Sequence, residues 1–187
     1  MTIFEYVMVL LSMVLSLSLT QLVSGVGELA RSRNVRWSLA HGLWIVVGFG
    51  LILDVWTSYW LIRDVPRWGL LSIVFMLLQT IAIYLFNLWL LPRLAGDEPM
   101  DLNAFLLDNR RLFLGAVIAS YIAGVIFNVS LVPPETFELS NYAILPIAVG
   151  ISAAAWWFRA GWVQIAAPAL TLAMMLFYFA THFQTIG

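Results

Sequence analysis

The chain has 187 residues, of which 63% are hydrophobic and 10% are charged, and its formal net charge is −1. Soluble domains carry about 25% charged residues, so this composition favours an integral membrane protein with no attraction to nucleic acid. The sequence contains no cysteine, which excludes disulfides, iron–sulfur clusters and thiolate metal sites. All nine basic residues are arginine. Without lysine, neither retinal nor pyridoxal phosphate can attach through a Schiff base, and we expect no cofactor.

Six apolar segments follow one another along the chain, with lengths suited to a hydrocarbon core of about 30 Å. We predict helices over residues 4–28, 37–62, 68–91, 112–132, 142–158 and 162–186. The predicted fold is an all-α integral membrane protein, a six-transmembrane-helix bundle that forms a single domain over residues 1–187. The first three helices and the last three would enter the membrane from opposite sides. This arrangement is also that of a 3+3 inverted repeat.

The polar residues of the first segment fall on one face. Ser12, Ser16, Thr20 and Ser24 follow one another at intervals of four, and Glu5 precedes Ser12 by seven. At about 100° per residue, these positions cover roughly a third of a helix circumference. Small hydroxyl side chains let two helices approach closely and form hydrogen bonds. We therefore predict that the first helix is the central post of the bundle, and that this serine stripe either packs against its neighbours or lines a narrow path.

Arginine is distributed unevenly among the connections between segments. The odd-numbered connections carry seven arginines, and the even-numbered connections carry two. Positive residues favour the cytoplasmic side of a membrane, so both termini are predicted to lie outside. Tryptophans near the segment ends are typical of interfacial aromatic belts.

The third connection is the only one that is long enough to contain secondary structure of its own. Asp101 is placed to cap a helix on which Leu102, Phe105 and Leu106 share a face. Two interpretations remain open: an interfacial helix that leads into the fourth segment, or a solvated turn.

Three short motifs in the first two segments carry a resemblance. They are Phe4-Glu5-Tyr6, the Leu-Thr-x-Leu run from Leu19 to Leu22, and His41-Gly-Leu-Trp44. With these motifs the chain resembles a group of short, uncharacterised bacterial membrane proteins. The resemblance implies a bacterial inner membrane, and it implies no activity. In such a membrane the arginine distribution would place both termini in the periplasm.

Five polar residues are predicted to share the outer half of the membrane: Glu5, Asp54, Asn128, Tyr178 and His182. Asp54, for example, follows Arg36 by 18 residues, which is about 27 Å along a helix. Polar groups inside a membrane are costly and are therefore default functional candidates. These five residues form a candidate outward-facing polar pocket. The alternative is that Glu5 and Asp54 end in interfacial water and that His182 is a helix-end residue.

Five other polar residues are predicted to lie in the inner half: Gln21, Glu28, His41, Asn87 and Gln164. Glu28 and His41 flank the arginine-rich first connection. These five residues are a candidate inner polar cluster, in which Glu28 and His41 either form an inner gate or solvate the connection.

More specific chemistry finds little support in the sequence. The only two histidines, His41 and His182, are placed near opposite membrane surfaces, which disfavours a haem with two histidine ligands. The carboxylates lack the spacing of a metal site. Ser24 and His41 lie on the same side of the membrane, but no third group and no oxyanion-hole motif accompany them. No catalytic or metal-binding residue is predicted.

Two functions therefore stand nearly level, and an intramembrane enzyme is less favoured. The first is a conduit or carrier for a small solute or ion. The second is a non-catalytic membrane subunit or assembly partner of a larger complex. Small residues in the fourth and fifth segments, such as Gly150 and Ala154, predict close helix packing within the chain or between copies. The expected partners are the lipid bilayer and a second copy or another membrane protein.

Overall fold

The structure is a computed structural model, and it describes residues 2–63, 65, 68–93, 99–131 and 144–182. The helices in these residues are α1 (Ile3–Arg31), α2 (Leu39–Leu61), α3 (Leu70–Leu90), α4 (Leu102–Leu131), α5 (Ile144–Trp157) and α6 (Gly161–His182). The predicted all-α bundle is confirmed. Five of these helices are long and apolar enough to cross a membrane, and α5 is shorter, with 14 residues. The inverted repeat stays a prediction.

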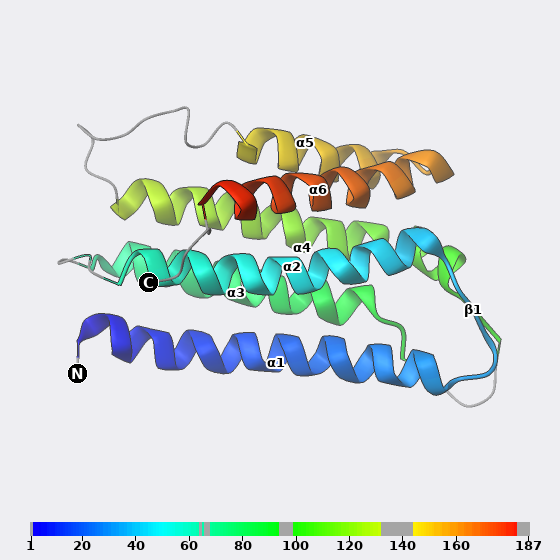
Figure 1. The fold of residues 1–187 in the computed structure, drawn as a ribbon, viewed down its shortest axis with the longest axis horizontal. Coiled ribbons are helices and arrows are strands. Elements are labelled where there is room, and N and C mark those ends of the chain that lie inside the picture. The colour runs from blue at the N-terminus through cyan, green and yellow to red at the C-terminus, as the bar shows by residue number, and fades with distance from the viewer. Residues whose placement is uncertain (1, 64, 66–67, 94–98, 132–143, 183–187) are drawn as a thin grey trace.

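Successive helices run in opposite directions, so that α6 ends at the same end of the bundle at which α1 begins (Figure 1). We call this the N-terminal end. The other end, where α1, α3 and α5 end, holds most of the arginines, and we call it the arginine-rich end. The arginines near this end are Arg31, Arg33, Arg36, Arg93, Arg110, Arg111 and Arg159.

A short parallel pairing joins two connections at the arginine-rich end. Strand β1 (Val35–Arg36) pairs with strand β2 (Met100–Asp101), with Val35 opposite Met100 and Arg36 opposite Asp101. The Met100 amide donates to the Asn34 carbonyl at 2.9 Å. Arg36 Nη1 and Asp101 Oδ2 form an ion pair at 3.5 Å. The pairing fixes the entry of α2 relative to that of α4.

Asp101 also caps α4, as predicted. Its Oδ1 accepts hydrogen bonds from the amides of Asn103 at 2.8 Å and Ala104 at 3.1 Å. These backbone donors, Ala104 foremost, hold the pKa of Asp101 below its usual value of 3.8. The helix then continues without interruption for 30 residues. The solvated turn is therefore wrong, and the predicted helix over residues 102–111 is confirmed. This helix is not a separate element, because it forms the first turns of the long α4, in which Leu102 and Leu106 are fully buried.

The prediction that α1 is the central post is also wrong. This helix lies at the edge of the bundle, beside α3 (Figure 1). Its buried residues recur at intervals of three and four: Val7, Leu11, Leu15, Ser18, Leu22, Gly25 and Leu29. The predicted serine stripe lies on another face, where Ser16, Thr20 and Ser24 are exposed and Ser12 is half-buried.

The physical reason is that lipid is as apolar as the protein core, so van der Waals packing and not polarity decides which face of a helix is buried. The packed face of α1 consists mainly of leucines, together with Ser18 and Gly25. Gly25 allows the closest approach, because a Cβ added to Gly25 would lie 2.5 Å from Leu91 Cδ1.

Candidate functional site

The described part of the bundle contains a cavity of about 310 Å³, lined by residues from α2, α3, α4, α5 and α6. Most of the lining is aliphatic or aromatic, as is usual for small-molecule sites. Its polar and titratable lining residues are Asp54, Ser58, Tyr59, Gln79, Ser120, Tyr121, Asn128, Thr171 and Tyr178. We call this space the Asp54 cavity.

The Asp54 cavity occupies the half of the bundle nearer the N-terminal end. Two of its lining residues mark this position: Ile62, the C-cap of α2, and Leu145, the second residue of α5. The cavity therefore extends to the ends of the helices. On the opposite side, the lining goes no deeper than Leu51 on α2 and Ile83 on α3.

Two glycines bring side chains of neighbouring helices close to the cavity. A Cβ added to Gly124 on α4 would lie 2.7 Å from Gln79 Nε2, so the absence of a side chain makes room for Gln79 between α3 and α4. A Cβ added to Gly50 on α2 would lie 2.7 Å from Met175 Cε, and Met175 lines the cavity from α6. Glycine at both positions thus sets the spacing of the walls.

Tyr59 anchors the wall between α2 and α3. Its hydroxyl lies 3.0 Å from the Met76 carbonyl, 3.1 Å from Thr80 Oγ1 and 3.3 Å from Gln79 Oε1. Thr80 Oγ1 itself donates to the Met76 carbonyl at 2.8 Å. This network holds the polar side chains of α2 and α3 in fixed positions.

Several polar residues of the lining donate hydrogen bonds to backbone carbonyls of their own helices. Ser120 Oγ donates to the Val117 carbonyl at 2.8 Å, and Thr171 Oγ1 donates to the Ala167 carbonyl at 3.0 Å. A hydroxyl has a single proton, so these two groups retain only acceptor capacity toward the cavity. Asn128 Nδ2 donates one of its two N–H groups to the Gly124 carbonyl at 2.8 Å, and its Oδ1 remains as an acceptor.

Asp54 is the one charged residue in the described lining. Among the residues that the structure describes, no hydrogen bond and no ion pair reaches its carboxylate. The ion pairs Arg36–Asp101 and Arg159–Asp108 both lie at the arginine-rich end. A carboxylate inside a membrane is costly unless it is protonated or meets a positive charge.

The structure brings three of the five candidate outer residues together, because Asp54, Asn128 and Tyr178 all line the cavity. Glu5 is not among the lining residues. It lies at the exposed start of α1, where its carboxylate accepts a hydrogen bond from the Thr2 amide at 2.9 Å in a capping box. His182 is the last residue of α6, and its side chain lies outside the described part of the structure.

The candidate inner residues do not form one cluster. His41 is buried on α2, and its Nε2 lies 2.9 Å from the carbonyl of Leu90, the last residue of α3. A carbonyl can only accept, so Nε2 carries the proton and Nδ1 is left as an unpaired acceptor. His41 thus satisfies one of the free carbonyls at the C-terminus of α3.

Gln164 has the same role at the C-terminus of α5. Its Nε2 donates to the carbonyls of Ala155 and Phe158, each at 2.8 Å. Arg110, which sequence reasoning counted only as a loop charge, is buried and donates through Nε to the Trp156 carbonyl at 3.1 Å. Both side chains satisfy carbonyls that the end of a helix leaves free.

The remaining inner residues lie on or against α1. Asn87 on α3 donates from Nδ2 to Ser18 Oγ at 2.8 Å and joins these two helices. Gln21 is half-buried, and Glu28 is exposed. These five residues therefore do not form one cluster, because His41, Asn87 and Gln164 serve separate helix contacts. The inner gate of Glu28 and His41 stays a prediction.

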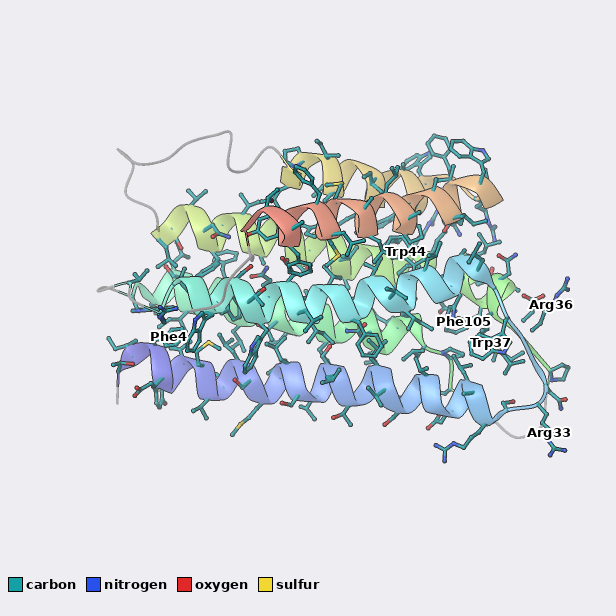
Figure 2. The ribbon with its side chains drawn as sticks, in the orientation of Figure 1. Phe4, Arg33, Arg36, Trp37, Trp44 and Phe105 are labelled. Carbon is teal, nitrogen blue, oxygen red and sulfur yellow. The ribbon has the colours of Figure 1, made fainter. Side chains whose placement is uncertain are left out.

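Aromatic rings fill the core between the cavity and the arginine-rich end. Trp44, Phe86 and Phe113 are all 0% exposed. Their ring centroids lie 6.2 Å (Trp44–Phe86), 5.6 Å (Trp44–Phe113) and 5.9 Å (Phe86–Phe113) apart, in edge-to-face arrangements. We call these three residues the aromatic plug. Figure 2 shows Trp44 within the bundle, whereas Arg33 and Arg36 lie at its arginine-rich end.

Sequence reasoning missed Tyr59, Gln79 and Tyr121 as lining residues. Gln79 and Thr80 are adjacent polar residues in the middle of an apolar segment, and this was the available signal. In the described residues, no group of three or more His, Asp or Glu side chains is arranged to hold a metal ion.

Comparisons with known proteins found no matching family model, no matching curated protein and no matching solved structure. The Asp54 cavity is therefore the main basis for a functional assignment.

Proposed function

We propose that this polytopic membrane protein is a carrier that binds a small solute in the Asp54 cavity. The observation that carries the proposal is a cavity with a charged group, placed in one half of a membrane bundle and reaching the helix ends there. Its volume of about 310 Å³ is at the lower end of the range for small-molecule sites. It therefore suits a solute of modest size.

The closed half of the bundle favours a carrier over an open channel. A channel needs a continuous polar path, but the aromatic plug fills the core beyond the cavity with three fully buried rings. A binding site that is closed on one side is what alternating access requires of one of its states. In this proposal, the structure is the state in which the plug is closed.

We further propose that the cavity faces the outside of a bacterial inner membrane. The support is the concentration of arginine at the opposite end, which favours the cytoplasm. Both termini would then be periplasmic.

Single-cysteine labelling tests the carrier proposal directly, because the natural chain has no cysteine. Ser58→Cys places a thiol in the cavity lining, and Ser18→Cys places one in the dry contact between α1 and α3. Both changes replace only an oxygen by a sulfur. In proteoliposomes of known orientation, a small membrane-impermeant methanethiosulfonate should label Ser58→Cys faster from the side to which the cavity opens than from the other side, and Ser18→Cys should stay unlabelled.

Three results would contradict the proposal. If Ser58→Cys is not labelled from either side, the cavity is closed to water. If it is labelled at the same rate from both sides in uniformly oriented vesicles, the aromatic plug does not close one side and the path is continuous, as in a channel. If Ser18→Cys is labelled as fast as Ser58→Cys, the difference between the two halves of the bundle is not real.

A second candidate function, a membrane subunit or assembly partner, is favoured by α5. A Cβ added to Gly150 would meet no atom within 4 Å, and Gly150 and Ala153 are exposed. An open surface of small residues is typical of a contact with another transmembrane helix. Native mass spectrometry in mild detergent should then detect a homo-oligomer or a bound partner. Only monomer across a concentration series would remove this alternative.

A further inference from the structure

The charge balance of the Asp54 cavity restricts what can enter it. Asp54 is the only charged residue in its described lining, and no basic side chain faces it there. An anion would place a second negative charge beside this carboxylate in a medium of low dielectric constant, where repulsion is strong. A cation would offset the cost of the buried carboxylate. The charge balance therefore excludes anions and favours cations.

The hydrogen-bonding groups of the lining point to the same kind of ligand. The hydroxyls of Ser120 and Thr171 donate to their own helices and retain only lone pairs for a ligand. Asn128 retains its Oδ1. A ligand that brings its own N–H or O–H donors would therefore find acceptors at these three residues.

The apolar part of the lining suits an organic cation better than a bare metal ion. Tyr59, Tyr121, Phe127 and Tyr178 supply aromatic rings, and Tyr59 and Phe127 pack edge to face at 5.9 Å. Aromatic faces attract cations, especially in a desolvated site. Met174 and Met175 also line the cavity, and methionine side chains adapt to ligands of irregular shape.

We infer that the Asp54 cavity binds a small amphipathic organic cation, with its positive group against Asp54 and its apolar part among the aromatic and methionine side chains. This inference rests on the proposed solute-carrier function and names its substrate class.

Three probes of similar size and different charge test the inference: 2-phenylethylammonium, 2-phenylethanol and phenylacetate. The readout is the concentration of each probe that halves the labelling rate of Ser58→Cys in the full chain in proteoliposomes. The ammonium probe should protect at a concentration at least about tenfold lower than the alcohol. Phenylacetate should not protect.

Substitution of the carboxylate then identifies its role. In the Ser58→Cys background, Asp54→Asn should raise the half-protecting concentration of the ammonium probe about tenfold or more and should leave that of the alcohol nearly unchanged. Asp54→Glu, which retains the charge, should restore the preference for the cation. Asp108→Asn is the matched control, because Asp108 is exposed at the arginine-rich end, and it should change neither value.

The outcomes separate the two proposals. The proposed substrate class is wrong if the alcohol protects as well as the ammonium probe, or if Asp54→Asn leaves the half-protecting concentration of the ammonium probe unchanged. Neither result contradicts the proposed solute-carrier function. Labelling of Ser58→Cys that none of the three probes slows also rejects the amphipathic cation. If Ser58→Cys is not labelled at all, both proposals fail.

Discussion

Ser16 and Ser18 lie two residues apart on α1 and have opposite environments. Ser18 is fully buried and accepts a hydrogen bond from Asn87 Nδ2 at 2.8 Å, whereas Ser16 is exposed on the outer face. Asn87 Oδ1 already has no hydrogen-bond partner within the described residues. The contact with Ser18 is therefore what satisfies this buried amide.

The Ser18→Ala variant should lower stability by about 1 kcal/mol, because it leaves the Asn87 amide without an acceptor in a dry contact. Ser16→Ala, the matched control, should change stability by no more than about 0.5 kcal/mol, as exposed substitutions usually do. Thermal unfolding of both variants in the same mild detergent is the measurement. Equal melting temperatures would show that the α1–α3 hydrogen bond contributes nothing.

At the scale of the elements, α2 and α3 approach each other most closely at Gly48. A Cβ added there would collide with Asn87 Oδ1 and lie 3.2 Å from Phe86 Cε1. Gly42, on the first turn of the same helix, has no atom within 4 Å of an added Cβ. The two glycines therefore separate the effect of helix contact from the effect of helix propensity.

Gly48→Ala should destabilise the protein by about 1–3 kcal/mol, since the extra methyl group overpacks the contact between α2 and α3. Gly42→Ala should be neutral or stabilise the protein by up to about 1 kcal/mol, because alanine favours a helix. Thermal or denaturant unfolding in one detergent would compare them. If Gly48→Ala melts as high as Gly42→Ala, then α2 and α3 are not in close contact at this position.

At the scale of the whole molecule, the two ends of the bundle differ in charge and in packing. The arginine-rich end has the β1–β2 pairing, the helix-capping side chains and the aromatic plug. The N-terminal end has the Asp54 cavity. The orientation of the chain therefore decides from which side of the membrane a solute would enter.

The single-cysteine variants Gly69→Cys and Ala160→Cys test the orientation of the chain in the membrane, and neither variant removes an arginine. Gly69 is exposed at the N-cap of α3, and Ala160 is exposed between α5 and α6. A membrane-impermeant thiol reagent should label Gly69→Cys on intact bacterial cells, and it should label Ala160→Cys only after permeabilisation. The reverse pattern would place the cavity on the cytoplasmic side.

The linear sequence was sufficient for the helical bundle and for most helix bounds, although α4 begins ten residues before the predicted start. In lipid, each apolar segment must satisfy its own backbone, so segment length and composition determine the helical bundle. The rise of about 1.5 Å per residue then fixes how deep each side chain lies. This is why Asp54, Asn128 and Tyr178, on three different helices, were grouped from the sequence and line the same cavity.

Only the tertiary structure decided which face of each helix is packed. Lipid is as apolar as the protein core, so a stripe of serines does not reveal which face of α1 is buried, and leucine contacts placed the stripe outside. The pairing of Val35 with Met100 and the capping of α3 by His41 depend on residues far apart in the chain. Such contacts follow from how the helices pack, which no local pattern in the sequence encodes.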